Sequence, residues 1–187
     1  MTTPSRFSRR HRVVAGDPPG AADVLARVTG LSKGAVKDAM RKGAVHVGRS
    51  GRTPNRLRRE TATVRPGDVL EIHYDPELLA LRPPEARLVK DAVRWSAWNK
   101  PAGLLSQGTE FGDHASLLRQ VEKLLDRPVF PVHRLDREVE GLVLVAHDAT
   151  AAAALSALLR EAKVVKRYRA EVIGNVEVRR GKEGTID

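Results

Sequence analysis

Apolar residues in the first part of the chain recur at two different spacings. Helical spacing predicts a helix over residues 21–30, where Gly30 suits the C-terminal end. Ser32 is a good N-cap for a second helix ending near Lys42. Single-residue alternation then predicts short strands at residues 45–47 and 69–74. The first part therefore predicts two helices followed by a small sheet.

The second part contains longer apolar runs. We expect a first strand at residues 93–98 and an amphipathic helix over 114–125. The continuous apolar run at 142–145 is typical of a strand buried on both faces. We also expect an alanine-rich helix to about residue 163, capped by Asp148 or Thr150. A strand over 164–173 is predicted after it.

Three prolines divide these two groups of elements. Pro76, Pro83 and Pro84 favour extended backbone, so we place a linker at 76–90. The chain before Asp17 is rich in arginine, and we expect a disordered basic arm there. The predicted division is therefore arm 1–16, small domain 17–75, linker 76–90 and larger domain 91–187, with an α+β fold.

Composition narrows the range of partners. Lysine and arginine number 33 against 23 acidic residues, which gives a net charge of +10 and favours nucleic acid over a membrane surface as the partner. No segment approaches the ~20 apolar residues of a spanning helix. Cysteine is absent and the six histidines are scattered, so we expect no disulfide, no metal site and a cytoplasmic location.

A polar cluster precedes the apolar run at 142–145. It reads His133-Arg134-Leu135-Asp136, and a glycine, Gly141, stands between it and the run. A carboxylate in a loop with rigid flanks can do chemistry. On the pattern alone, a surface salt bridge or a turn cap is the commoner role for such an aspartate.

Three blocks of sequence, taken together, favour the chemical role of Asp136 over the structural one. They are Asn99-Lys100-Pro101-Ala102-Gly103, the cluster 133–136, and Lys166-Arg167-Tyr168. In this order and at these separations, residues 93–187 resemble the RluA-type pseudouridine synthases. The resemblance implies a mixed, mainly antiparallel sheet with flanking helices. It also implies isomerisation of uridine to pseudouridine in ribosomal or transfer RNA, no cofactor, and a monomer.

The same resemblance implies roles for five side chains. Asp136 would be the catalytic carboxylate, acting as a nucleophile or as a base on the ribose. Tyr168 would pack on the uracil, and Arg134 would fill the space left by the extruded base or grip a phosphate. A plain salt bridge is the alternative for Arg134. His133 is expected to support the site by packing, and Lys100 to hold the loop at the mouth of the pocket.

The first part carries a second resemblance. The segments Leu31-Ser32-Lys33, Gly43-Ala44-Val45-His46-Val47 and Arg65-Pro66-Gly67-Asp68-Val69 are similar to the small RNA-binding module named after ribosomal protein S-four. The match covers about residues 19–74 and implies phosphate contacts, although a solvated basic face is the bland alternative. The expected RNA-binding side chains are Lys33, Lys37, Arg41, Lys42, Arg49, Arg52 and Arg56.

Two departures from the synthase pattern lead to a second hypothesis. Val139-Glu140 stand where the family has Thr-Ser, and the resemblance stops at Asp187, where family members continue with further strands. Those strands carry a cation that pairs with the catalytic carboxylate, so we expect the C-terminal part of the catalytic domain to be missing. The alternative function is an RNA-binding protein without turnover that acts in RNA maturation.

Overall fold

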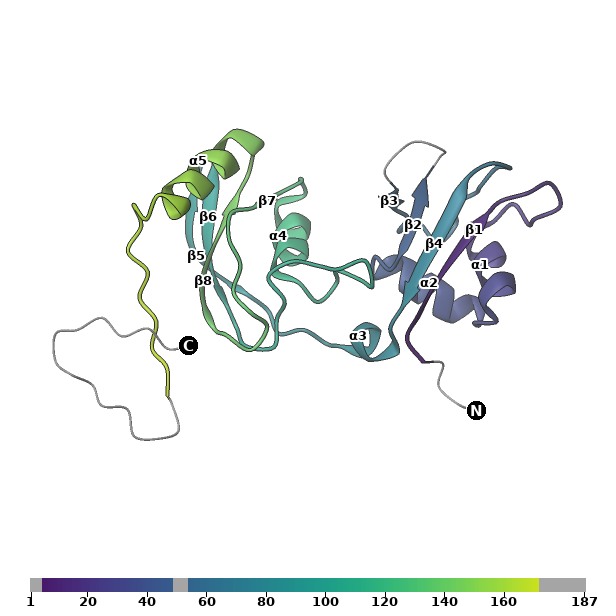
Figure 1. The fold of residues 1–187 in the computed structure, drawn as a ribbon, viewed down its shortest axis with the longest axis horizontal. Coiled ribbons are helices and arrows are strands. Elements are labelled where there is room, and N and C mark those ends of the chain that lie inside the picture. The colour runs from purple at the N-terminus through teal and green to yellow at the C-terminus, as the bar shows by residue number, and fades with distance from the viewer. Residues whose placement is uncertain (1–4, 49–53, 172–187) are drawn as a thin grey trace.

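The computed structural model describes residues 5–48 and 54–171 and contains two separate four-stranded sheets (Figure 1). The strand order is β1-β4-β2-β3 in the first sheet and β5-β6-β8-β7 in the second. Neighbouring strands pair antiparallel in both. With the helices beside them, these sheets confirm the predicted α+β class.

The two helices of the first half and two of its four strands follow the sequence prediction closely. The elements are β1 Phe7–Arg12, α1 Ala21–Thr29, α2 Lys33–Arg41, β2 Val45–Gly48, β3 Asn55–Arg56 and β4 Val69–Tyr74. Gly30 ends α1 with a left-handed φ of 74°, and the Ser32 hydroxyl accepts a hydrogen bond from the Ala35 amide at the start of α2. Both predicted caps are confirmed.

The expectation of a disordered arm is wrong for residues 7–12. They form β1, which pairs with β4 along its whole length from Phe7 to Arg12, and the Phe7 ring stacks on Tyr74 at 5.5 Å. Four of the six β1 residues are exposed, so the strand lacks the apolar alternation that would mark it in the sequence. Pairing covers one edge of β4 and satisfies its backbone groups.

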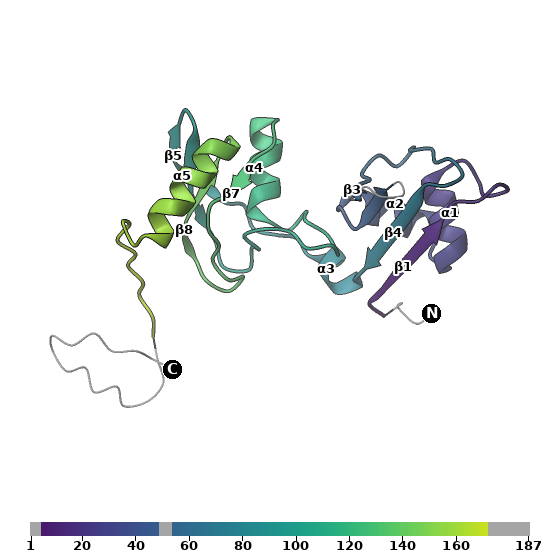
Figure 2. The same cartoon turned by 45° about the horizontal axis from the view of Figure 1, so that its top comes forward.

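Helices α1 and α2 close the first core. They lie together on one side of the sheet (Figure 2). Leu25, Met40, Val45, Leu70 and Ile72 are all fully buried there. Apolar burial of this kind stabilises by roughly 25 cal/mol per Å² removed from water. The first half thus has a core of its own.

The second half begins earlier than predicted. Helix α3, Pro76–Ala80, still belongs to the first half, because its Leu79 is buried in the first core. The elements of the second half are β5 Arg87–Ala92, β6 Trp95–Lys100, α4 Leu117–Leu125, β7 Phe130–Pro131, β8 Gly141–Ala146 and α5 Ala149–Arg160. The segment predicted as an extended linker contains α3, which Asp75 caps, and the start of β5. Asp148 caps α5 as one of the two predicted alternatives.

Two strand predictions in this half need correction. Residues 164–171 contain no regular secondary structure instead of the expected strand, and 172–173 lie outside the described residues. The run at 142–145 does form a strand, β8, but Leu142 is 59% exposed, so burial on both faces is wrong for the start of the strand. The second core gathers Trp98, Leu117 and Val143 between α4 and the sheet.

One loop joins the two halves through polar contacts. The Asp113 amide donates to the Lys42 carbonyl at 3.0 Å, and Arg56 Nη2 donates to the Thr109 carbonyl at 2.7 Å. Loop 107–113 therefore docks on the end of α2 and on β3.

Candidate active site and RNA interface

The polar cluster lies on the loop that connects β7 to β8. Ser106 fixes its middle, because its hydroxyl donates to the Leu135 carbonyl at 2.6 Å and accepts from the Leu135 amide at 2.9 Å. Leu135 is thus held by both of its backbone polar groups. Asp136 follows directly on this anchored residue, so its backbone has little freedom to move.

Lys100 fixes the far side of the same loop. Its side chain is fully buried, and Nζ donates to the carbonyls of Leu104 at 2.7 Å, Pro101 at 3.2 Å and Arg137 at 3.2 Å. Burial lowers the pKa of the Lys100 ammonium, and the carboxylates on the loop, Asp136 among them, raise it in part. These contacts join the β6 end to the Asp136 loop, and the role of Lys100 at a pocket mouth stays a prediction.

His133 ties the loop to β8. Its Nε2 accepts a hydrogen bond from the Leu144 amide at 3.1 Å, which requires an unprotonated Nε2. Burial lowers the pKa of the His133 imidazole, which agrees with a neutral ring. His133 therefore contacts the loop and β8 as a neutral hydrogen-bond acceptor, and its role in the site stays a prediction.

Asp136 and Arg134 both face solvent. Their side chains are 76% and 72% exposed, and the nearest distance between them, from Arg134 Nη2 to Asp136 Oδ1, is 3.8 Å. They line an open hollow of about 170 Å³, which we call the Asp136 hollow, together with residues 105–109. An exposed ion pair this long contributes little to stability, so both groups are available to a ligand.

Tyr168 lies elsewhere. It is 71% exposed and lines a separate hollow of about 520 Å³ together with His133 and Leu144; only Leu135 belongs to both linings. The structure therefore does not bring Tyr168 and Asp136 into one pocket. The physical reason is the unpaired backbone of residues 164–171, because only strand pairing would fix the register of the tyrosine.

The predicted RNA-binding cations of the first half already have acidic partners. Arg49 and Arg52 lie outside the described residues. The other five pair as follows: Lys33 with Asp23 at 2.6 Å, Lys37 with Glu60 at 4.0 Å, Arg41 with Glu60 at 2.6 Å, Lys42 with Asp38 at 2.7 Å and Arg56 with Asp113 at 3.4 Å. Lys42 and Arg56 also hold the junction, so phosphate binding by these five stays a prediction.

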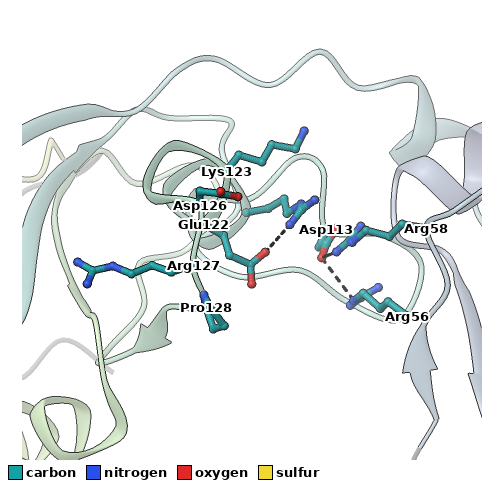
Figure 3. Close-up of a pocket in the computed structure, with 9 residues that line it drawn as sticks. Arg56, Arg58, Asp113, Glu122, Lys123, Asp126, Arg127 and Pro128 are labelled. Carbon is teal, nitrogen blue, oxygen red and sulfur yellow. Dashed lines mark hydrogen bonds and ion pairs between the residues drawn. The ribbon is translucent and has the colours of Figure 1, made fainter.

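A basic hollow at the junction was missed in the sequence (Figure 3). It measures about 590 Å³, and we call it the junction hollow. The charged side chains of its lining are Arg56, Arg58, Asp113, Arg119, Glu122, Lys123, Asp126 and Arg127. The available signal was the spacing of Arg119 and Lys123, four residues apart on one face of α4, but nothing local pairs that face with Arg56 and Arg58.

Residues 5–48 and 54–171 contain neither a metal-binding cluster nor a membrane-spanning helix. Among them, no group of three histidine or acidic side chains could hold a metal ion. No helix in the same residues has the length and apolar character needed to cross a membrane.

Comparison with known proteins identifies the second half. Residues 94–186 match the family model described as RNA pseudouridylate synthase. The "tRNA pseudouridine synthase C" of Vibrio parahaemolyticus is 30% identical over 109 residues, 57% of this chain and 43% of that protein. The "Ribosomal large subunit pseudouridine synthase C" of Pasteurella multocida is 31% identical over 161 residues, 81% of this chain and 48% of that protein.

A solved structure, "Human RNA Pseudouridylate Synthase Domain Containing 4", aligns with a TM-score of 0.34 and 25% identity, covering 41% of this chain and 30% of that one. The chain spans less than half the length of the curated relatives described above. The family match begins just before β6 and includes Lys100, the Asp136 loop and Tyr168. The second half of the chain therefore matches the RNA pseudouridylate synthase family over residues 94–186.

Proposed function

We propose that this chain acts as an RNA pseudouridine synthase on ribosomal or transfer RNA, with Asp136 as the catalytic carboxylate. The observation that supports the proposal is the combination of a fixed backbone and an exposed carboxylate in the Asp136 loop. Its backbone is fastened by Ser106, Lys100 and His133, while the Asp136 carboxylate is left exposed in an open hollow. A fixed backbone with a free acidic group is what a positioned nucleophile or base requires.

The reaction suits such a group. The bond between the anomeric carbon and N1 of uracil breaks, and a bond from the same carbon to C5 forms. The C5 proton is lost and N1 gains a proton, so atoms balance without an oxidant or a hydrolytic water. Asp136 would attack the anomeric carbon or take a proton from the ribose, as carboxylates do in glycoside chemistry.

Arg134 supports the step that precedes chemistry. A stacked uridine has to be extruded at a cost of a few kcal/mol. The Arg134 guanidinium is exposed beside Asp136 and can stack in the vacated space or grip a phosphate. Tyr168 would have to cross from its own hollow past Leu135 to meet the uracil, so its stacking role requires residues 164–171 to rearrange when RNA binds.

The first half would bind RNA. Its two capped helices on a small sheet agree with the S-four-like module suggested by the sequence. The Pasteurella relative is named for the large ribosomal subunit and the Vibrio relative for transfer RNA, so we extend both RNA classes to this chain as candidate substrates. The module would contribute phosphate contacts rather than base recognition.

Replacement of Asp136 by asparagine tests the catalytic assignment. Unmodified transcripts are incubated with the protein, and pseudouridine is mapped by carbodiimide adducts that stop reverse transcription. We expect stops with the wild type, none with Asp136→Asn, and wild-type stops with Asp91→Asn, an exposed aspartate on β5. Stops that persist in Asp136→Asn would overturn the role of this carboxylate.

A second function, RNA binding without turnover, is favoured by the separation of Tyr168 from Asp136. It predicts that the wild type shifts the same transcripts in a binding assay and leaves no stops. If the protein binds the transcripts and leaves reverse-transcription stops, it is the enzyme. If it binds them and leaves no stops, the second function is correct.

A further inference from the structure

The junction hollow carries more positive than negative charge. Five cations face it against three carboxylates. Arg56 and Arg58 share one carboxylate oxygen, Asp113 Oδ2, and that single acid cannot neutralise two guanidiniums. Lys123 is exposed on α4 and has no ion pair within the described part of the chain. An excess of cations in a concave surface attracts polyanions.

The junction hollow is linked to the Asp136 hollow through shared lining residues. Between them lies a third hollow of about 250 Å³. It shares four residues with the junction hollow: Arg56, Asp113, Arg119 and Glu122. It shares two with the Asp136 hollow: Gln107 and Gly108. The three hollows are therefore neighbours on the surface, and an RNA segment that binds at the junction lies next to the loop that carries the exposed carboxylate.

We propose that the junction hollow is a binding subsite for the phosphate backbone of the RNA segment next to the target uridine. The proposal rests on the proposed function, because it assigns the same substrate to a second surface. Both halves of the chain contribute to this subsite: Arg58 comes from the first half, and Arg119 and Lys123 come from α4. Arginine and lysine are the side chains that protein surfaces use for phosphate.

Loop 107–113 fixes the position of the junction hollow relative to Asp136. Asp113, at one end of the loop, meets Arg56 and Arg58, and Ser106, just before its other end, holds the residue preceding Asp136. A phosphate bound at the junction would thus be held at a set distance from the reacting uridine. This arrangement uses binding energy away from the reaction centre to position the substrate.

Lys123→Gln gives the direct test. RNA affinity is measured as a function of salt with an unmodified stem-loop transcript that carries a uridine-rich loop. Losing one phosphate contact should flatten the slope of log affinity against log salt by about 0.7–0.9. Lys90→Gln, an exposed lysine on β5 that lines none of the three hollows, removes the same charge and should leave the slope close to that of the wild type.

A second variant works in the opposite direction and excludes misfolding as an explanation. Glu122 pairs with Arg119 at 2.6 Å on the surface of α4, so Glu122→Gln frees that arginine for phosphate at little cost in stability. We expect tighter RNA binding and a slope steeper by about 0.7–0.9. Glu161→Gln, at the end of α5, is the matched control and should change neither quantity.

The outcomes separate the two proposals. If the wild type leaves pseudouridine but Lys123→Gln behaves as Lys90→Gln does, or Glu122→Gln fails to tighten binding, the junction subsite is refuted while the enzyme stands. If no pseudouridine forms, yet both variants shift the salt slope as expected, the subsite stands and the isomerase is refuted.

Discussion

At the scale of single residues, the Asp136 loop is organised by groups that do not take part in chemistry. The Lys100 ammonium donates hydrogen bonds to three backbone carbonyls, and the Ser106 hydroxyl bonds both backbone polar groups of Leu135. A buried ammonium without such partners would be strongly destabilising. The supporting side chains of Lys100 and Ser106 are therefore buried and bonded, whereas those of Arg134 and Asp136 are exposed to a ligand.

His133 makes stability depend on pH. Its pKa is lowered in the folded chain by burial, while the unfolded chain takes up a proton near pH 6.5. Below that pH the unfolded state binds more protons, so the free energy of unfolding falls as the solution is acidified. We expect this loss between about pH 7 and 5, at no more than about 1.4 kcal/mol per pH unit for one histidine.

Urea unfolding followed by tryptophan fluorescence at both pH values measures the effect. His133→Gln retains an acceptor for the Leu144 amide and removes the titration, so its midpoint should fall less than that of the wild type on acidification. His114 also has a pKa lowered by burial and will leave part of the slope in place. Equal losses in variant and wild type would contradict the assignment to His133.

At the scale of elements, the two glycines that end α1 and α2 differ in one respect. Gly30 and Gly43 have similar left-handed φ angles, 74° and 81°. A Cβ on Gly30 meets nothing within 4 Å, but a Cβ on Gly43 would stand 2.5 Å from Asp113 Oδ1 and 2.6 Å from Arg58 Nη1. Only the second glycine lets the loop of the other half approach.

Alanine at each position separates backbone strain from docking. Gly30→Ala should lower the free energy of unfolding by about 1–2 kcal/mol through its left-handed backbone alone. Gly43→Ala should cost more and should also speed hydrogen exchange of the Asp113 amide, which donates to the Lys42 carbonyl. Unchanged exchange at Asp113 in Gly43→Ala would show that docking does not require the glycine.

The sequence predicts an element well when the residues that form it are close together along the chain. Helix limits were predictable because a cap is local: Ser32 and Asp148 bond to amides three residues away. Strand β1 and the irregular segment 164–171 depend on partners far along the chain, which no window of sequence contains. The same limit applies to the site: the loop motif was visible around Asp136, but the position of Tyr168 depends on long-range pairing.

At the scale of the whole molecule, the two cores share no residue. The contacts between the halves include ion pairs and hydrogen bonds such as Arg58 with Asp113, and the Phe111 ring meets His73 edge-on at 5.5 Å. Junctions made mainly of polar groups couple domains weakly. The junction subsite would then be completed only while loop 107–113 is docked. RNA that bridges the two halves would stabilise the docked arrangement by mass action.

Weak coupling predicts two unfolding transitions. Both tryptophans, Trp95 and Trp98, lie on β6, so fluorescence reports only the second half, whereas far-ultraviolet circular dichroism reports both. We expect the two signals to give different urea midpoints.

Two core variants test whether the halves unfold separately. Leu25→Ala, in the first core, should lower the free energy of unfolding by about 2–5 kcal/mol and move only the dichroism curve. Val143→Ala should move the fluorescence curve. Coincident curves in the wild type, or a fluorescence shift in Leu25→Ala, would mean that the polar junction joins the halves into one cooperative unit.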